Sequence, residues 1–283
     1  MGPQQVEVHP VGAVVYWGVG NTNRSQLASS LDDLGLVQYL PNKRTPDSSL
    51  FNALKHEVPE GGISRDYTIQ SLKDRGNNGY EVVEILKGEK YNTYNVLFSA
   101  RVDKTSEKVV FSEGLWDYSV IDNISVQKEY DNFREVVTGS AMGACLVDIC
   151  QHFRGTSLRP SGGIYWLPED VVETWDKVGQ AASDSSTGGN ESNVYRLRTV
   201  LDESAAAAVI DAITAEVDAQ SGEIIEGIGE LGERALRTRE ERSRNLKAKV
   251  EHYEQMLGEG LDKLKTVCDI ATKSAAHAVL AQL

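Results

Sequence analysis

The pattern of apolar and polar residues changes character at one place along the chain. Between 181 and 193 the sequence AASDSSTGGNESN is small, polar and nearly free of apolar side chains. Because such a segment buries too little surface to offset the entropy lost on ordering, it predicts a flexible linker or loop. We therefore expect a domain over 1–180, where strand and helix patterns mix, and a helical region over 194–283.

The first 180 residues predict an α+β domain built on an antiparallel sheet. Between 65 and 126 the apolar residues recur with a period near two, and the intervals are short and rich in turn residues, which favours a meander. Elsewhere the apolar residues recur at helical spacing behind capping residues such as Asn23 and Thr45. The predicted elements are a strand at 12–20, helices at 24–35 and 45–58, five strands between 65 and 126, a helix at 130–153, a strand at 162–168 and a helix at 168–182.

The C-terminal region predicts a long helical hairpin or a coiled coil. Apolar residues recur at steps of three and four from 209 to 228 and again from 246 to 271. Four glycines between 222 and 232 favour a turn or hinge between these runs. We expect the second run to bury its apolar seam against a helix of the same chain or of another subunit. The predicted seam residues are Leu246, Val250, Tyr253, Leu257, Leu261, Leu264 and Val267.

A run of basic residues from 234 to 249 is the strongest charge feature of a chain whose net charge is −13. The run supports contact with a nucleic-acid backbone or with an acidic partner. It is equally typical of a solvated helix face on which cations pair with carboxylates at neighbouring turns, and we favour this second interpretation. The candidate polyanion-binding residues are Arg234, Arg237, Arg239, Arg242, Arg244, Lys247 and Lys249.

Two segments that contain glycine are candidate anion-binding loops. In WGVGNTNRS a strand ends and a helix begins, which is the order found in phosphate-binding loops, but the third glycine and the lysine of those loops are missing. In SLRPSGG the glycines follow a helix and precede a strand, so a simple turn explains them. The candidate residues are Gly18, Gly20, Arg24, Arg159, Gly162 and Gly163.

The remaining composition narrows the functional classes. An acidic chain with a pI near 4.9 is a poor general coat for nucleic acids or anionic membranes. Its three cysteines form no disulfide framework, and no apolar run is long enough to be a secretory signal or a membrane span. Since the sulfur atoms of Cys145 and Cys150 would point about 140° apart on a helix, we expect no metal site there. We predict a cytoplasmic protein without a cofactor, a metal or a membrane partner.

The segments VVYWGVG, NRSQLASSLDDLGL and SLRPSGGIYWLPE, taken in this order, resemble uncharacterised proteins carried by bacterial viruses and other mobile elements. The resemblance covers most of the chain and contains no catalytic motif. It implies a microbial or viral setting, which would be the host cytoplasm for a viral protein, and it implies no activity and no site residues.

Three functional hypotheses follow from these patterns. The first is an interaction or assembly protein, not an enzyme, that forms a homo-oligomer or docks another protein through its C-terminal helices. The second is a nucleic-acid-binding protein that uses the basic run over 234–249. The third is an enzyme that binds a nucleotide or another phosphorylated ligand at the loop from Gly18 to Arg24.

Overall fold

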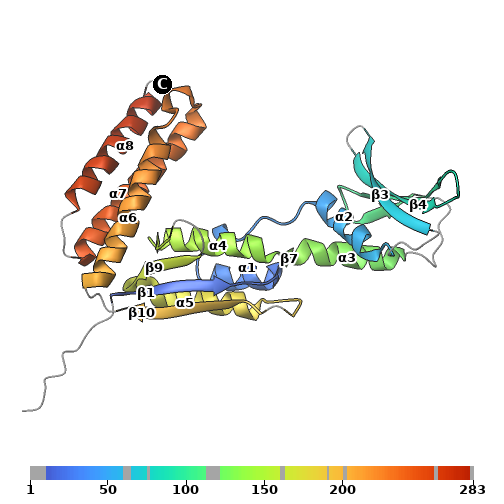
Figure 1. Cartoon of the computed structure of the whole chain (residues 1–283), viewed down its shortest axis with the longest axis horizontal. Coiled ribbons are helices and arrows are strands. Elements are labelled where there is room, and N and C mark those ends of the chain that lie inside the picture. Colours follow the sequence, from blue (N-terminus) through green and yellow to red (C-terminus); the bar gives the residue numbers. More distant parts are fainter. Residues whose placement is uncertain are drawn as a thin grey trace, which may run out of the picture.

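The chain folds around three hydrophobic cores that follow one another in space. The structure is a computed structural model and describes residues 11–59, 65–74, 77–112, 122–159, 163–189, 191–199, 203–257 and 261–280. A central layer of sheet and helices lies between a helical bundle on one side and a smaller sheet-and-helix lobe on the other (Figure 1). The predicted α+β class with antiparallel sheets is confirmed.

The central sheet has the strand order β10-β1-β9-β8, and every neighbouring pair in it is antiparallel. Alternation along its strands gives each face its own core. Ala13 and Leu167 belong to the core beneath the sheet, whereas Val14 and Trp166 belong to the core of the helical bundle. The strands are β1 (Gly12–Gly18), β8 (Thr156–Ser157), β9 (Ile164–Pro168) and β10 (Asn193–Thr199).

Three helices, α1 (Arg24–Asp33), α4 (Gly139–His152) and α5 (Glu169–Asp184), contribute to the core beneath this sheet. Asn23 caps α1 as predicted, because its side chain accepts a hydrogen bond from the Gln26 amide. The short strands β2 (Thr22–Asn23) and β7 (Val136–Val137) pair with each other, and the 3-10 helix η1 spans Val37–Tyr39.

The outer lobe is a four-stranded meander packed against two helices. Leu50 and Leu54 of α2 share a core with Val126 and Tyr130 of α3 and with one face of the sheet. Thr45 caps α2 as predicted. The elements are α2 (Pro46–Glu57), β3 (Arg65–Asp74), β4 (Asn77–Leu86), β5 (Thr93–Val102), β6 (Val109–Phe111) and α3 (Asn123–Glu135).

The C-terminal bundle consists of three helices, α6 (Glu203–Ile225), α7 (Glu233–Leu257) and α8 (Asp262–Leu280). The turn between α6 and α7 contains Gly227, whose φ of 62° lies in the left-handed region that favours glycine, and the 3-10 helix η2 (Ile228–Glu230). The predicted turn among the glycines is therefore present.

Helix α7 is tied to the central layer at the turn between α4 and β8. The Tyr253 hydroxyl donates a hydrogen bond to the Arg154 carbonyl oxygen (2.8 Å) and accepts one from the Thr156 hydroxyl (2.7 Å). The Tyr253 ring also packs against Trp166 of β9, with ring centroids 5.5 Å apart. Because Tyr253 and Trp166 are buried, these contacts attach the bundle to the sheet through a dry interface.

The structure corrects several element boundaries. The predicted linker over 181–193 is structured at both ends, since 181–184 form the last turn of α5 and Asn193 begins β10. Strand β10 lies inside the region predicted to be helical. The predicted helix over 130–153 is interrupted by β7, and the predicted strand up to 126 is helical from Asn123. Residues 118–121 of that predicted strand lie outside the described residues.

The predicted seam is buried within its own chain. Leu246, Val250 and Tyr253 lie on α7, whereas Leu264 and Val267 lie on α8, so the seam does not run along one continuous helix. Leu246, Val250, Tyr253, Leu261 and Leu264 share a core with α6 and β9, and Leu257 and Val267 pack against that core partly buried. Helices of the same chain therefore cover the seam, which is one of the two expected partners, and contact of these residues with another subunit stays a prediction.

Replacing the buried Tyr253 by phenylalanine (Tyr253→Phe) tests the attachment of α7. The change leaves the Thr156 hydroxyl and the Arg154 carbonyl without their partner, and we expect the free energy of unfolding to fall by about 1–3 kcal/mol. Urea denaturation followed by tryptophan fluorescence measures the change. The matched control is Tyr94→Phe on an exposed strand position, which should have no effect, and equal stability of the two variants would contradict the assignment.

Candidate functional site

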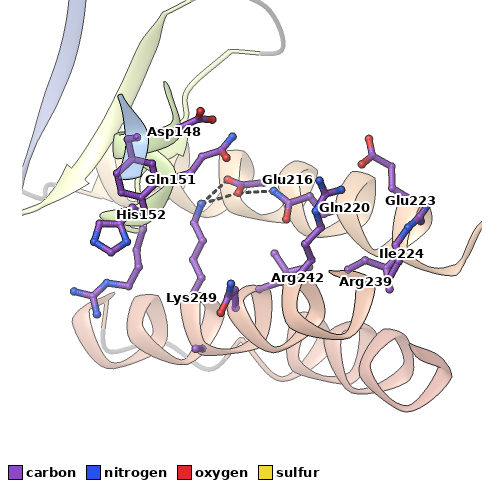
Figure 2. A pocket seen from close by; sticks show the side chains of 15 residues that line it. Asp148, Gln151, His152, Glu216, Gln220, Glu223, Ile224, Arg239, Arg242 and Lys249 are labelled. Carbon is purple, nitrogen blue, oxygen red and sulfur yellow. Dashed lines mark hydrogen bonds and ion pairs between the residues drawn. The ribbon is translucent and has the colours of Figure 1, made fainter. Parts of the chain in front are cut away.

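A cleft of about 750 Å³ lies where the central layer meets the bundle. Helices α6 and α7 run along two sides of the cleft, and the end of α4 with the turn after it lies at one end (Figure 2). The volume falls in the range of small-molecule sites. The lining residues are Tyr39, Asp148, Gln151, His152, Arg154, Glu216, Gln220, Glu223, Ile224, Arg239, Arg242, Asn245, Leu246, Ala248 and Lys249.

The middle of the cleft is built by a buried ion pair between α7 and α6. The Lys249 ammonium lies 2.7 and 2.8 Å from the two carboxylate oxygens of Glu216 and donates a third hydrogen bond to the Gly155 carbonyl oxygen (2.7 Å). Burial lowers the pKa of Lys249, while Glu216 opposes that shift. The Gln220 side chain donates to the same carboxylate, as Figure 2 shows. All three hydrogen bonds of the Lys249 ammonium therefore go to protein atoms, and the side chain connects α7 to α6 and to the turn after α4.

Arg239 and Arg242 are in a different situation. Both line the cleft from α7, and neither forms an ion pair with any described residue. The Nη1 atom of Arg239 is buried and has no hydrogen-bond partner within the described part of the chain. A buried guanidinium nitrogen without a hydrogen-bond acceptor is costly.

The other cations of the basic run are mostly occupied. Arg237 pairs with Glu233 (2.6 Å), Arg244 pairs with Glu240 (3.0 Å), and both pairs are one helical turn apart. Lys247 pairs with Asp269 of α8 (2.6 Å). These pairs match the expected solvated helix face, whereas Arg234 is exposed and does not line the cleft. The run thus separates into cations that stabilise the bundle and two that face the cleft.

Sequence reasoning missed most of the cleft. Glu216, Gln220 and Glu223 follow one face of α6 at steps of four and three residues, which is a readable signal for a polar stripe along that face. The sequence carries no such signal for the α4 residues, because their place beside the cleft depends on how the bundle packs against the central layer.

The loop from Gly18 to Arg24 is engaged in internal contacts. The Gly20 amide donates to the Ser192 hydroxyl (3.2 Å), and the Asn23 amide donates to the Ser185 carbonyl oxygen (2.6 Å). The Asn21 side chain accepts from the Gly139 amide (3.2 Å). Gly18 and Arg24 flank these contacts, and none of this loop lines the cleft. The loop therefore joins β1 to β7, α4 and the end of α5.

The second glycine segment also lies away from the cleft. Gly163 lies beside the ring of Trp17, to which an added Cβ would come within 3.5 Å. The Arg159 carbonyl oxygen accepts a hydrogen bond from the Ser157 hydroxyl (2.7 Å), which is typical of a turn. Gly162 lies outside the described residues.

One group of described side chains has the spacing of metal ligands. His56 Nδ1 lies 3.1 Å from a Glu57 oxygen and 4.0 Å from a Glu129 oxygen, in the outer lobe. His56 is exposed, and the same polar contacts join α2 to α3. The three cysteines are free and buried, and burial raises the pKa of Cys145 to about 12.

No helix within the described residues combines the length and the apolar character that crossing a bilayer requires. Comparison with curated proteins and with solved structures finds no match. A family model described as "Family of unknown function (DUF6744)" matches residues 10–282, which is nearly the whole chain. The chain therefore belongs to this family of unknown function.

Proposed function

We propose that the protein binds a small phosphate-bearing ligand in the cleft between α4 and the helices α6 and α7. The observation that carries the proposal is the pairing pattern on α7. Three cations of the run pair with carboxylates outside the cleft, and Lys249 pairs with Glu216 within its lining, whereas Arg239 and Arg242 face the cleft and have no ion pair among the described residues. Guanidinium groups bind phosphate oxygens through two parallel hydrogen bonds.

The geometry favours a ligand of the size of the cleft over a polynucleotide. Nucleic-acid binding by the whole run would need its cations on one continuous face, but Lys247 and Lys249 are held by Asp269 and Glu216 on two different helices. A ligand in the cleft would touch α4 on one side and α7 on the other. It would therefore strengthen the attachment of the bundle to the central layer.

Replacing Arg242 by alanine (Arg242→Ala) tests the proposed ligand class. Losing one charged hydrogen-bonding group should weaken the binding of tripolyphosphate by about ten- to a hundredfold. Isothermal titration calorimetry measures the affinity. Arg242 is exposed, so the change should leave the fold intact.

Two further variants make this test specific. Arg244→Ala removes the same charge from the same helix but outside the cleft, and it should bind tripolyphosphate like the unchanged protein. Glu223→Gln removes a negative charge from the cleft lining, so it should strengthen binding. Absence of tripolyphosphate binding by the unchanged protein, or an equal loss in Arg242→Ala and Arg244→Ala, would overturn the proposal.

A second candidate function is self-association, now through strand β10. Strand β10 pairs with β1 along its whole length and has no partner on its other edge among the described strands. Its side chains Tyr195 and Leu197 are 47% and 57% exposed. An open edge with exposed apolar side chains is a template for another strand.

A second copy fits this edge in register. If two β10 strands pair in antiparallel fashion about Arg196, Tyr195 of each copy lies opposite Leu197 of the other, which is a favourable cross-strand pair. The two Arg196 side chains would meet at the centre, but each is already paired with Asp176 of its own α5. We therefore propose a dimer in which two four-stranded sheets become continuous.

Replacing Leu197 by lysine (Leu197→Lys) should convert such a dimer into a monomer, because a charge at the edge opposes strand pairing. Sedimentation velocity over a range of protein concentrations measures the mass. Val110→Lys, at an equally exposed position of the outer lobe, should leave the dimer intact. A monomeric unchanged protein would exclude this second candidate and leave ligand binding untouched.

A further inference from the structure

We propose that the phosphate-bearing ligand is a nucleotide, whose base lies at the His152 end of the cleft and whose phosphates lie at the Arg239 end. This inference rests on the proposed function, because it assigns the rest of the ligand once its anionic group is placed. It assigns a ligand group to the end of the cleft that lies away from Arg239 and Arg242.

The end of the cleft opposite the arginines is aromatic. The rings of Tyr39 and His152 lie with centroids 5.2 Å apart and planes 43° apart. Tyr39 is half-buried against the central core, and His152 is exposed in the cleft lining. Figure 2 shows His152 at one end of the cleft and Arg239 at the other. An exposed ring fixed against a second ring is a platform on which any base can stack.

Three further polar side chains line the cleft. Gln151 and Asp148 reach the cleft from α4 (Figure 2), and Asn245 of α7 also lines it. None of the three side chains makes a hydrogen bond or an ion pair with another described residue. Amide groups present a donor and an acceptor side by side, which is the pattern found along the edge of a base.

The length of the cleft matches this assignment. Along α7 the lining residues run from Arg239 to Lys249, and ten residues of helix span about 15 Å. The stacking platform and the arginines therefore lie too far apart for a lone phosphate to touch both. A ligand that uses both ends must be extended, with a planar group at one end and a phosphate group at the other. Nucleotides are the common metabolites with this layout.

The test compares three probes by isothermal titration calorimetry on the full chain: ATP, adenosine and inorganic tripolyphosphate. We expect ATP to bind about tenfold or more tightly than tripolyphosphate, because base stacking adds to the phosphate contacts. Adenosine should bind much more weakly than ATP. GTP, CTP and UTP replace ATP in parallel titrations, so that a preference for another base is not missed.

His152→Ala identifies the platform. We expect this exposed substitution to weaken nucleotide binding about tenfold and to leave tripolyphosphate binding unchanged. The matched control is His56→Ala on the outer lobe, which should change neither. An equal loss of nucleotide and tripolyphosphate affinity in His152→Ala would show that His152 serves the phosphate end, and this would overturn the assignment.

The outcomes separate this inference from the proposed function. If tripolyphosphate binds in an Arg242-dependent way and no nucleotide binds more tightly, the nucleotide assignment fails and phosphate binding stands. If neither tripolyphosphate nor any nucleotide binds, the proposed function fails and the nucleotide assignment fails with it.

Discussion

Two side chains of α7 hold the bundle on the central layer, and the other features of the molecule depend on them. Tyr253 and Lys249 reach the turn at 154–156 and are both buried. Burial raises the pKa of the Tyr253 hydroxyl, which keeps its proton available for the Arg154 carbonyl oxygen. Arg154 is held with a φ of 61°, a conformation that costs energy in a residue other than glycine and that the surrounding contacts must maintain. The cleft exists because this joint is fixed.

The charged side chains near the turn at 154–156 have two roles. Some are buried and paired within the protein, and others line the cleft without an ion pair. A buried ion pair such as Lys249 with Glu216 costs desolvation energy and is repaid only by close geometry, which three hydrogen bonds supply here. Arg239 and Arg242 form no ion pair with a described residue that would offset their desolvation energy. The cleft is also lined by Asp148 and Glu223, so its unpaired charges among the described residues are two positive and two negative.

Elements and turns that neighbouring residues determine were predictable from the sequence. Contacts between elements far apart in the chain were not. Strand β1, the Asn23 cap of α1 and the glycine turn before α7 follow from short-range signals that the sequence carries. The sequence did not predict strand β10, because its apolar residues do not alternate clearly with polar ones. The polar stretch before it suggested a linker instead. The apolar seam was predicted as an apolar surface, but the sequence left its partner open between the same chain and another subunit, because periodicity alone does not say which helix covers it. The basic run was visible in the sequence, and only the structure separates Arg239 and Arg242 from its other members.

A phosphate-bearing ligand that fills the cleft would link α4 to α7. Hydrogen exchange measured by mass spectrometry, with and without ATP, tests this because it reports on each segment separately. We expect slower exchange in peptides that cover 148–157 and 239–253, with little change in the outer lobe. Unchanged exchange in both segments at saturating ATP, or protection confined to other parts of the chain, would refute ligand binding in the cleft.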